Sequence, residues 1–235
     1  AGASIVSVVE DQPGSHRIAL GLSNGQVLVF KHVYKVTYPN NVKTITPQLE
    51  YPFGEAPITL DPQGRPLEHV AISENGDSLM LSGSVGAELQ LLNISREENM
   101  MTGEVTSEQS RIELPQMTEP VKAIFIDPRQ QWLYVINGRA LADVFSLRDK
   151  SLNGRYKLLE DADTEITAST QLVGGISLIL GNSKGGLAQW FMARDPDGEQ
   201  RFKLIRSFQM GTAPVVQIDA EDRRKGFIAL DSSGK

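Results

Sequence analysis

The feature that most constrains this sequence is a recurring pair of short β-rich runs joined by a glycine-bearing turn. Four copies occupy residues 17–30, 78–92, 132–145 and 177–191, and a fifth begins at Gly226 and reaches its turn at Gly234. Glycine and asparagine suit these turns because a tight hairpin needs positive φ angles. No segment shows a sustained 3.6-residue apolar period. The sequence therefore predicts an all-β repeat protein.

Flanking runs extend each hairpin to four strands. A further β-rich run precedes each copy, at residues 5–9, 67–72, 121–126, 166–172 and 215–218, and three of these runs directly follow Pro66, Pro120 and Pro214. A more polar run follows each of the first four copies, at residues 42–49, 111–114, 155–159 and 202–208. Polar, proline-flanked strands are typical of an outer sheet edge. The spacing of the copies fits propeller blades of ~40–50 residues that carry loop insertions.

We therefore predict a β-propeller with WD40-like or YVTN-like blades of four antiparallel strands. Residues 1–235 form a single domain in this interpretation, with blades at about 4–60, 66–115, 120–160 and 165–209 and a partial fifth at 214–235. The insertion at residues 34–65 is rich in Pro and Tyr, and the polar insertion at 96–110 is expected to hold one helical turn. Propellers usually close with four to eight blades. A four-bladed ring would leave the fifth copy unplaced, so we expect a fragment of a larger ring that continues beyond Lys235.

Composition narrows the classes of function. Formal net charge is −6 and the sequence pI is about 5.2. This charge argues against a nucleic-acid surface, which needs a basic patch, and provides no positive field for an anionic membrane. The chain has no cysteine, so thiolate metal sites and a cysteine nucleophile are excluded. No apolar run approaches the ~20 residues that span a bilayer.

The polar residues assemble into no catalytic set. His16, His32 and His69 lack metal-ligand spacing, and the acidic pairs are better explained as solvated loops. The sequence contains no nucleophile elbow, dinucleotide fingerprint or phosphate loop. We therefore expect no enzyme activity and no catalytic, cofactor or metal site.

One basic cluster is a candidate partner contact. Arg223, Arg224 and Lys225 lie in the turn after the first strand of the last blade. They could meet an acidic partner or lipid headgroups, and a simple solvated turn is the alternative explanation.

Several strings resemble one family. They are Glu50-Tyr51-Pro52, residues 95–99 with 102–105, Gln189-Trp190-Phe191 with Arg194-Asp195, and residues 223–227. Together they resemble the long form of the phosphate ABC transporter permease of gamma-proteobacteria (PstC-like), which has a large extracytoplasmic insert after its first membrane helix. The Gly-His and Trp-Asp dipeptides of typical WD repeats are absent.

The resemblance implies a non-catalytic periplasmic domain at the inner membrane, with the membrane helices outside this chain. Its expected partners are other transporter subunits and the phosphate-binding protein, without nucleic acid or cofactor. An open ring could also self-associate through unpaired strand edges. Two alternatives remain at this point: a truncated propeller enzyme of the lactonase or glycosidase kind, and a cytosolic WD-like scaffold.

Overall fold

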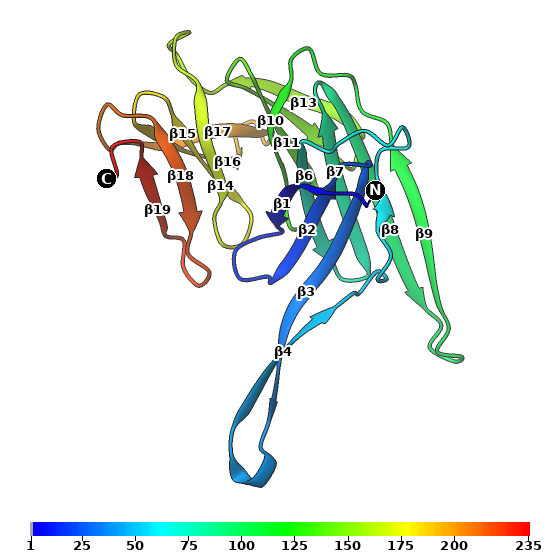
Figure 1. The fold of residues 1–235 in the computed structure, drawn as a ribbon. Coiled ribbons are helices and arrows are strands. Elements are labelled where there is room, and N and C mark those ends of the chain that lie inside the picture. The colour runs from blue at the N-terminus through cyan, green and yellow to red at the C-terminus, as the bar shows by residue number, and fades with distance from the viewer. Residues whose placement is uncertain (1) are drawn as a thin grey trace.

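The computed structural model describes residues 2–235, which form antiparallel sheets arranged around a central channel (Figure 1). Apart from the short β5, the strands of each sheet follow one another in chain order. Blade 1 holds β1 (Ile5–Glu10), β2 (Arg17–Leu22), β3 (Gln26–Thr37) and β4 (Thr44–Glu50), and the short β5 (Ile58–Thr59) pairs with β3. Blade 2 holds β6 (His69–Asn75), β7 (Ser78–Val85), β8 (Glu88–Glu98) and β9 (Val105–Ile112).

The remaining sheets repeat the pattern. Blade 3 holds β10 (Val121–Ile126), β11 (Trp132–Asn137), β12 (Leu141–Ser146) and β13 (Ser151–Lys157). Blade 4 holds β14 (Ile166–Gln171), β15 (Ser177–Asn182), β16 (Gly186–Arg194) and β17 (Gln200–Gln209), and blade 5 holds β18 (Val215–Ala220) and β19 (Phe227–Asp231). The predicted propeller of four four-stranded blades and a partial fifth is confirmed.

The two insertions lengthen hairpins, and one prediction for them is wrong. Residues 96–110, expected to hold a helical turn, instead continue β8 and β9 as a paired ribbon that turns at residues 99–104. The helical exception among residues 2–235 is a short 3-10 turn at Pro39–Asn41, at the tip of the β3–β4 hairpin. In both insertions the ladder that begins in the blade continues outward, so the backbone groups of the paired strands stay hydrogen-bonded.

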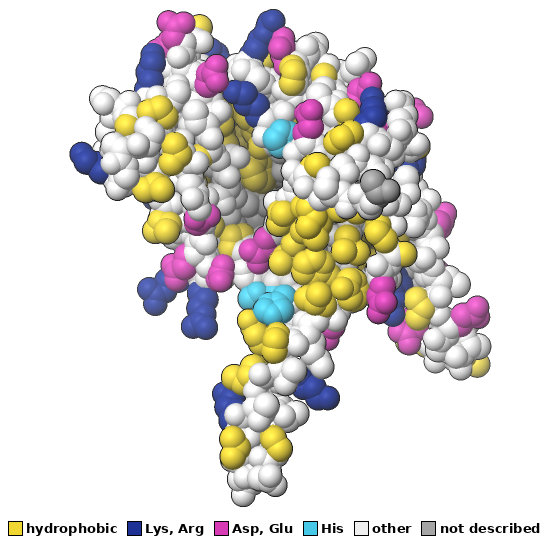
Figure 2. Space-filling model, in the orientation of Figure 1, with side chains coloured by type: hydrophobic (Ala, Val, Ile, Leu, Met, Phe, Trp, Pro, Cys, Tyr) yellow, Lys and Arg dark blue, Asp and Glu magenta, His cyan; other side chains and the backbone are white. Residues whose placement is uncertain are grey.

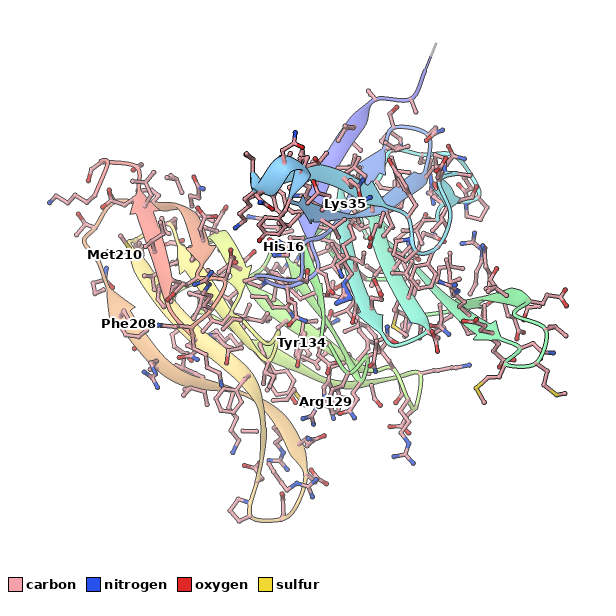
Figure 3. The ribbon with its side chains drawn as sticks, turned by 90° about the horizontal axis from the view of Figure 1, so that it is seen from below. His16, Lys35, Arg129, Tyr134, Phe208 and Met210 are labelled. Atoms are coloured by element: carbon pink, nitrogen blue, oxygen red, sulfur yellow. The ribbon has the colours of Figure 1, made fainter. Side chains whose placement is uncertain are left out.

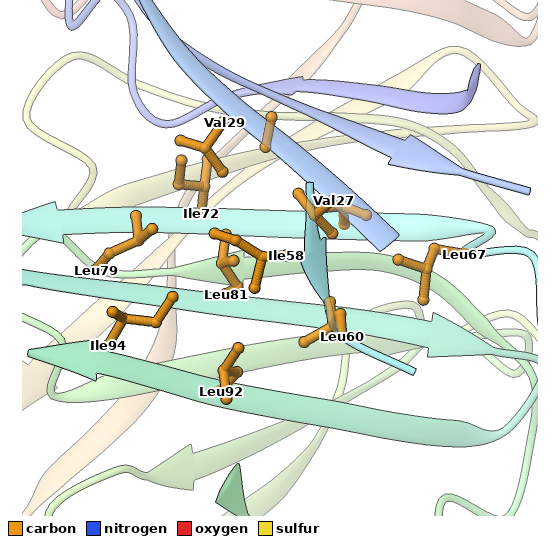
Figure 4. Packing of buried hydrophobic residues seen from close by; sticks show 12 residues of the cluster. Val27, Val29, Ile58, Leu60, Leu67, Ile72, Leu79, Leu81, Leu92 and Ile94 are labelled. Carbon is orange, nitrogen blue, oxygen red and sulfur yellow. The ribbon is translucent and has the colours of Figure 1, made fainter. Parts of the chain in front are cut away.

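The core lies between the sheets. Each blade has an upstream face, toward the preceding blade in chain order, and a downstream face toward the next. The first junction packs Ala19, Val27 and Val29 of the downstream face of blade 1 against Ile72, Leu79, Leu81, Leu92 and Ile94 of the upstream face of blade 2 (Figure 4). Three further clusters join blades 2 and 3, 3 and 4, and 4 and 5 in the same way. Alternate residues of one strand therefore enter two different junctions, since side chains of a strand point to opposite faces.

A repeated polar residue closes the turn after the second strand of three blades. The side-chain oxygen of Asn182 accepts hydrogen bonds from the backbone N–H groups of Lys184 and Gly186, at 2.9 Å each. Asn137 and Asp231 make the same two bonds in blades 3 and 5. Short polar side chains stabilise such turns by satisfying the backbone donors.

Candidate interaction surface

The most prominent surface feature is a two-stranded arm, residues 31–50, formed where β3 and β4 continue past the body of blade 1 (Figure 1). Every residue from 34 to 50 is exposed. The two strands of the arm pair antiparallel along its length, from Lys31 with Glu50 at the base to Thr37 with Thr44 near the tip. A two-stranded ribbon without a core is marginally stable on its own in water, so its anchor in blade 1 is what holds it.

The arm has two chemically different faces. Cross-strand pairing places Tyr34 opposite Pro47 and Val36 opposite Ile45, which makes one face apolar. The opposite face carries Lys31 and Lys35, with Glu50 at the base and uncharged residues at its other positions. Three lysines lie within residues 31–50, and the single acidic residue there is Glu50 at the base. The arm is therefore basic and apolar on a chain whose formal net charge is −6.

Other hairpins end on the same side of the ring. In an antiparallel blade the turn between strands one and two and the turn between strands three and four lie at the same end of the strands. This end carries the arm, the β8–β9 tip and the β18–β19 turn (Figure 1). Met100 and Met101 at the β8–β9 tip are 98% and 96% exposed. Figure 3 looks onto this end, with Lys35 on the arm and Arg129 on the β10–β11 turn.

The predicted basic contact lies on this side. Arg223, Arg224 and Lys225 occupy the β18–β19 turn, and all three are exposed. Arg224 lies 4.0 Å from the carboxylate of Glu221, a weak exposed pair. Their position fits either explanation offered above, partner contact or solvated turn. The sequence did not single out the arm, because exposure of its apolar residues depends on how far the ribbon extends beyond the blade.

The central channel is acidic. Its cavity of about 360 Å³ is lined by the first strand of every blade. The charged residues of the lining are Glu10, Asp11, Asp219 and Asp222, with no lysine or arginine. Across residues 2–235 no three acidic or histidine side chains come close enough to hold a metal ion. Repulsion from the acidic side chains of the lining disfavours a phosphate anion in this cavity.

Asp11 is the most perturbed group of the channel. Burial raises the pKa of Asp11 to about 6, although the Arg17 guanidinium opposes this shift. The Nε of Arg17 lies 3.1 Å from the Asp11 carboxylate, and the Nη1 of the same guanidinium lies 3.2 Å from the carboxylate of Glu74 in blade 2. The group thus tethers blade 1 to blade 2. The expectation that the chain has no enzyme activity stays a prediction.

His16 and His32 are joined through their backbones, because the N–H of His32 donates to the carbonyl oxygen of His16 at 2.9 Å, whereas His69 lies on another blade. His16 is in the β1–β2 turn, His32 is at the base of the arm with its ring 4.5 Å from that of Tyr34, and His69 begins β6. Burial lowers the pKa of His69.

Comparison with solved structures identifies the class. The β-propeller domain of Myceliophteria_thermophila Cps50 (Swd1) is 12% identical with a TM-score of 0.50, and the match covers 93% of this chain and 64% of that one. A chain of the mitotic checkpoint complex is 11% identical with a TM-score of 0.51, covering 97% and 58%. A chain of the BBS1N complex with ARL6DN is 12% identical with a TM-score of 0.57, covering 99% and 61%. The fold is that of the WD40-like β-propellers.

The likeness is one of fold. This chain spans about three fifths of the length of the structures it resembles. No family model matches the sequence, and no curated protein is significantly similar to it. Among the described residues there is no helix with the length and apolar character that a membrane crossing requires.

Proposed function

We propose that this chain is a non-catalytic interaction scaffold in the periplasmic domain of a phosphate ABC transporter permease. In this proposal the domain belongs to a protein of the bacterial inner membrane and contacts other transporter subunits and the phosphate-binding protein. The observation that carries the interaction role is the arm, which presents exposed apolar and basic side chains far from the core. Rigid scaffolds that position binding loops are a common use of propellers.

Exposed apolar groups on the arm support a contact with protein. Tyr34, Val36, Ile45 and Leu49 are each about half exposed or more on one face. Burying such groups is favourable by roughly 25 cal/mol per Å² of apolar surface. Tyrosine is enriched in interface cores, and a basic rim favours a partner with an acidic contact surface.

Three of the strings behind the transporter resemblance lie on the same side of the ring, whereas Gln189-Trp190-Phe191 lies within β16. Residues 95–99 and 102–105 flank the β8–β9 tip, Arg194-Asp195 begins the β16–β17 turn, and residues 223–227 overlap the β18–β19 turn. These turns lie at the end of the strands that carries the arm. We therefore assign partner contact to this end of the ring and not to the acidic channel.

The test is binding of the phosphate-binding protein to the full-length permease in nanodiscs, with and without phosphate. The variant Lys35→Glu reverses one charge on the arm. A matched variant, Lys122→Glu, changes an exposed lysine near the start of β10, at the other end of the strands.

We expect the arm variant to weaken binding by roughly tenfold or more and the Lys122 variant to leave it nearly unchanged, because a charge reversal acts mainly at the surface that meets the partner. Absence of any interaction between full-length permease and binding protein would refute the proposed partner. Equal loss in both variants would remove the arm from the contact.

A further inference from the structure

A second apolar surface lies on blade 1 itself. The upstream face of blade 1 carries Val8, Ile18, Leu20, Leu28 and Phe30, which adjoin one another across β1, β2 and β3. Figure 2 shows hydrophobic side chains gathered over this blade above the arm. Val8 is 66% exposed, and the other four are only partly buried.

The repeat shows what this face is built for. Ile18 pairs across the strands with Phe30 in blade 1. When the hairpins are aligned by their strand pairing, the same two positions also form a cross-strand pair in each later four-stranded blade. The corresponding pairs are Leu79 with Ile94, Leu133 with Phe145, and Leu178 with Trp190. All six of these side chains are buried, and each pair packs against the preceding blade.

Leu20 repeats the contrast at the next inward position. Its counterparts Leu81, Val135 and Leu180 are at most 1% exposed, whereas Leu20 keeps part of its surface in water. All four blades have an aliphatic side chain at this position, and they differ in whether another sheet packs against it. Blade 1 has no preceding sheet among the described residues.

The opposite end of the arc shows the complementary surface. Ile228 in β19 occupies the downstream position that Ala19, Met80, Tyr134 and Ile179 fill in blades 1 to 4. Those four side chains are buried in blade junctions, but Ile228 is 73% exposed. The two ends approach at their turns, where Gly14 lies against Asp222, without joining these two faces in a shared hydrophobic cluster.

We infer that the upstream face of blade 1 is a blade junction, covered in the complete gene product by the downstream face of another blade of the same ring. The three covered copies of this pattern each pack against the apolar downstream face of a four-stranded sheet, so we expect a sheet of the same kind as the cover here. The solved propellers that this chain resembles are longer, and the chain spans about three fifths of their length, as expected if the complete ring holds further blades. The inference does not depend on the transporter proposal.

Single-cysteine labelling tests the inference because residues 1–235 contain no cysteine, and any cysteine elsewhere in the complete gene product is first replaced by serine. The variants are Leu20→Cys on the open face, Leu81→Cys at the matched covered position, and Met100→Cys as an exposed reference. Val8→Cys, at a largely exposed position, reports on the same face if Leu20→Cys folds poorly. Each is treated with a maleimide in the 235-residue chain and in the complete gene product, with circular dichroism confirming the fold.

In the 235-residue chain we expect Val8→Cys to label at nearly the rate of Met100→Cys, and Leu20→Cys, which is partly buried, to label more slowly than Met100→Cys but far faster than Leu81→Cys. In the complete gene product both should slow by roughly 100-fold or more, toward the rate of Leu81→Cys, since a covered side chain reacts only after local opening. Labelling that stays fast in the complete gene product overturns the inference. Protection in the 235-residue chain that grows with its concentration also overturns it, and would assign the cover to a second copy.

Discussion

Leucine to alanine substitution at matched repeat positions would show directly how much stability each blade junction contributes. Leu81 in β7 and Leu20 in β2 occupy the same position of the repeat, and each pairs across its sheet with a leucine, Leu92 and Leu28 respectively. Leu81 is 0% exposed inside the junction of blades 1 and 2, whereas Leu20 lies on the open face. The two substitutions remove the same atoms from different environments.

The expected magnitudes follow from burial. Removing three carbons from a buried leucine costs about 2.4 kcal/mol in transfer free energy, at about 0.8 kcal/mol per methylene. A cavity enclosed by two sheets adds to this, for a total of about 3–4 kcal/mol at Leu81. At Leu20 part of the side chain is already in water and no closed cavity forms, so we expect about 1 kcal/mol. Leu180→Ala in blade 4 should resemble Leu81→Ala, because Leu180 is 1% exposed.

Urea unfolding followed by far-ultraviolet circular dichroism measures these differences. The slope of the free energy against urea should be unchanged in all three variants, which would show that the same surface is exposed on unfolding. A loss of more than about 3 kcal/mol for Leu20→Ala, at the scale of a fully buried leucine, would refute the reasoning. It would mean that this face is covered in the 235-residue chain in solution.

Three further predictions concern the channel, a close packing point and a turn. The pKa of Asp11 is raised to about 6 in the folded chain, above its unfolded value, so proton uptake stabilises the fold as pH falls. Between pH 7 and 5 the wild type should gain roughly 1 kcal/mol over Asp11→Asn in urea titrations, and equal pH profiles would contradict the shift. Gly181→Val should lower the free energy of unfolding, measured by thermal unfolding, by about 2 kcal/mol or more, because a Cβ there would lie 2.7 Å from a methyl carbon of Val215. Gly2→Val is the control and should be neutral, because a Cβ at Gly2 has no neighbouring atom within 4 Å. Asn182→Ala should cost about 1–2 kcal/mol, since it leaves two turn N–H groups without their acceptor, and a wild-type melting temperature would show that water replaces it.

Much of the fold could be predicted from the spacing of residues along the chain. The predicted hairpins correspond to β2–β3, β7–β8, β11–β12 and β15–β16, because strand periodicity and turn residues are local properties. Ribbon extensions were harder to predict, since the exposed polar strands of residues 96–110 lack the apolar alternation that marks a strand packed on a core.

The candidate site was only partly predictable. Arg223, Arg224 and Lys225 stood out as a charge cluster and do lie in an exposed turn. The arm and the acidic channel did not stand out, because the residues of each come together only when the strands pair or the blades surround the axis. Glu10 and Asp219, for example, both line the channel although they are distant in sequence.

The sequence by itself determined the repeating unit: strands, glycine-bearing turns and the chain order of strands within each sheet. Only the tertiary structure decided which face of each strand is covered, how far the arm projects and which ends of the arc stay open. The physical reason is that Leu20 and Leu81 carry the same side chain at the same repeat position, so no local signal distinguishes them. The difference arises from whether another sheet lies against them, which depends on contacts between blades.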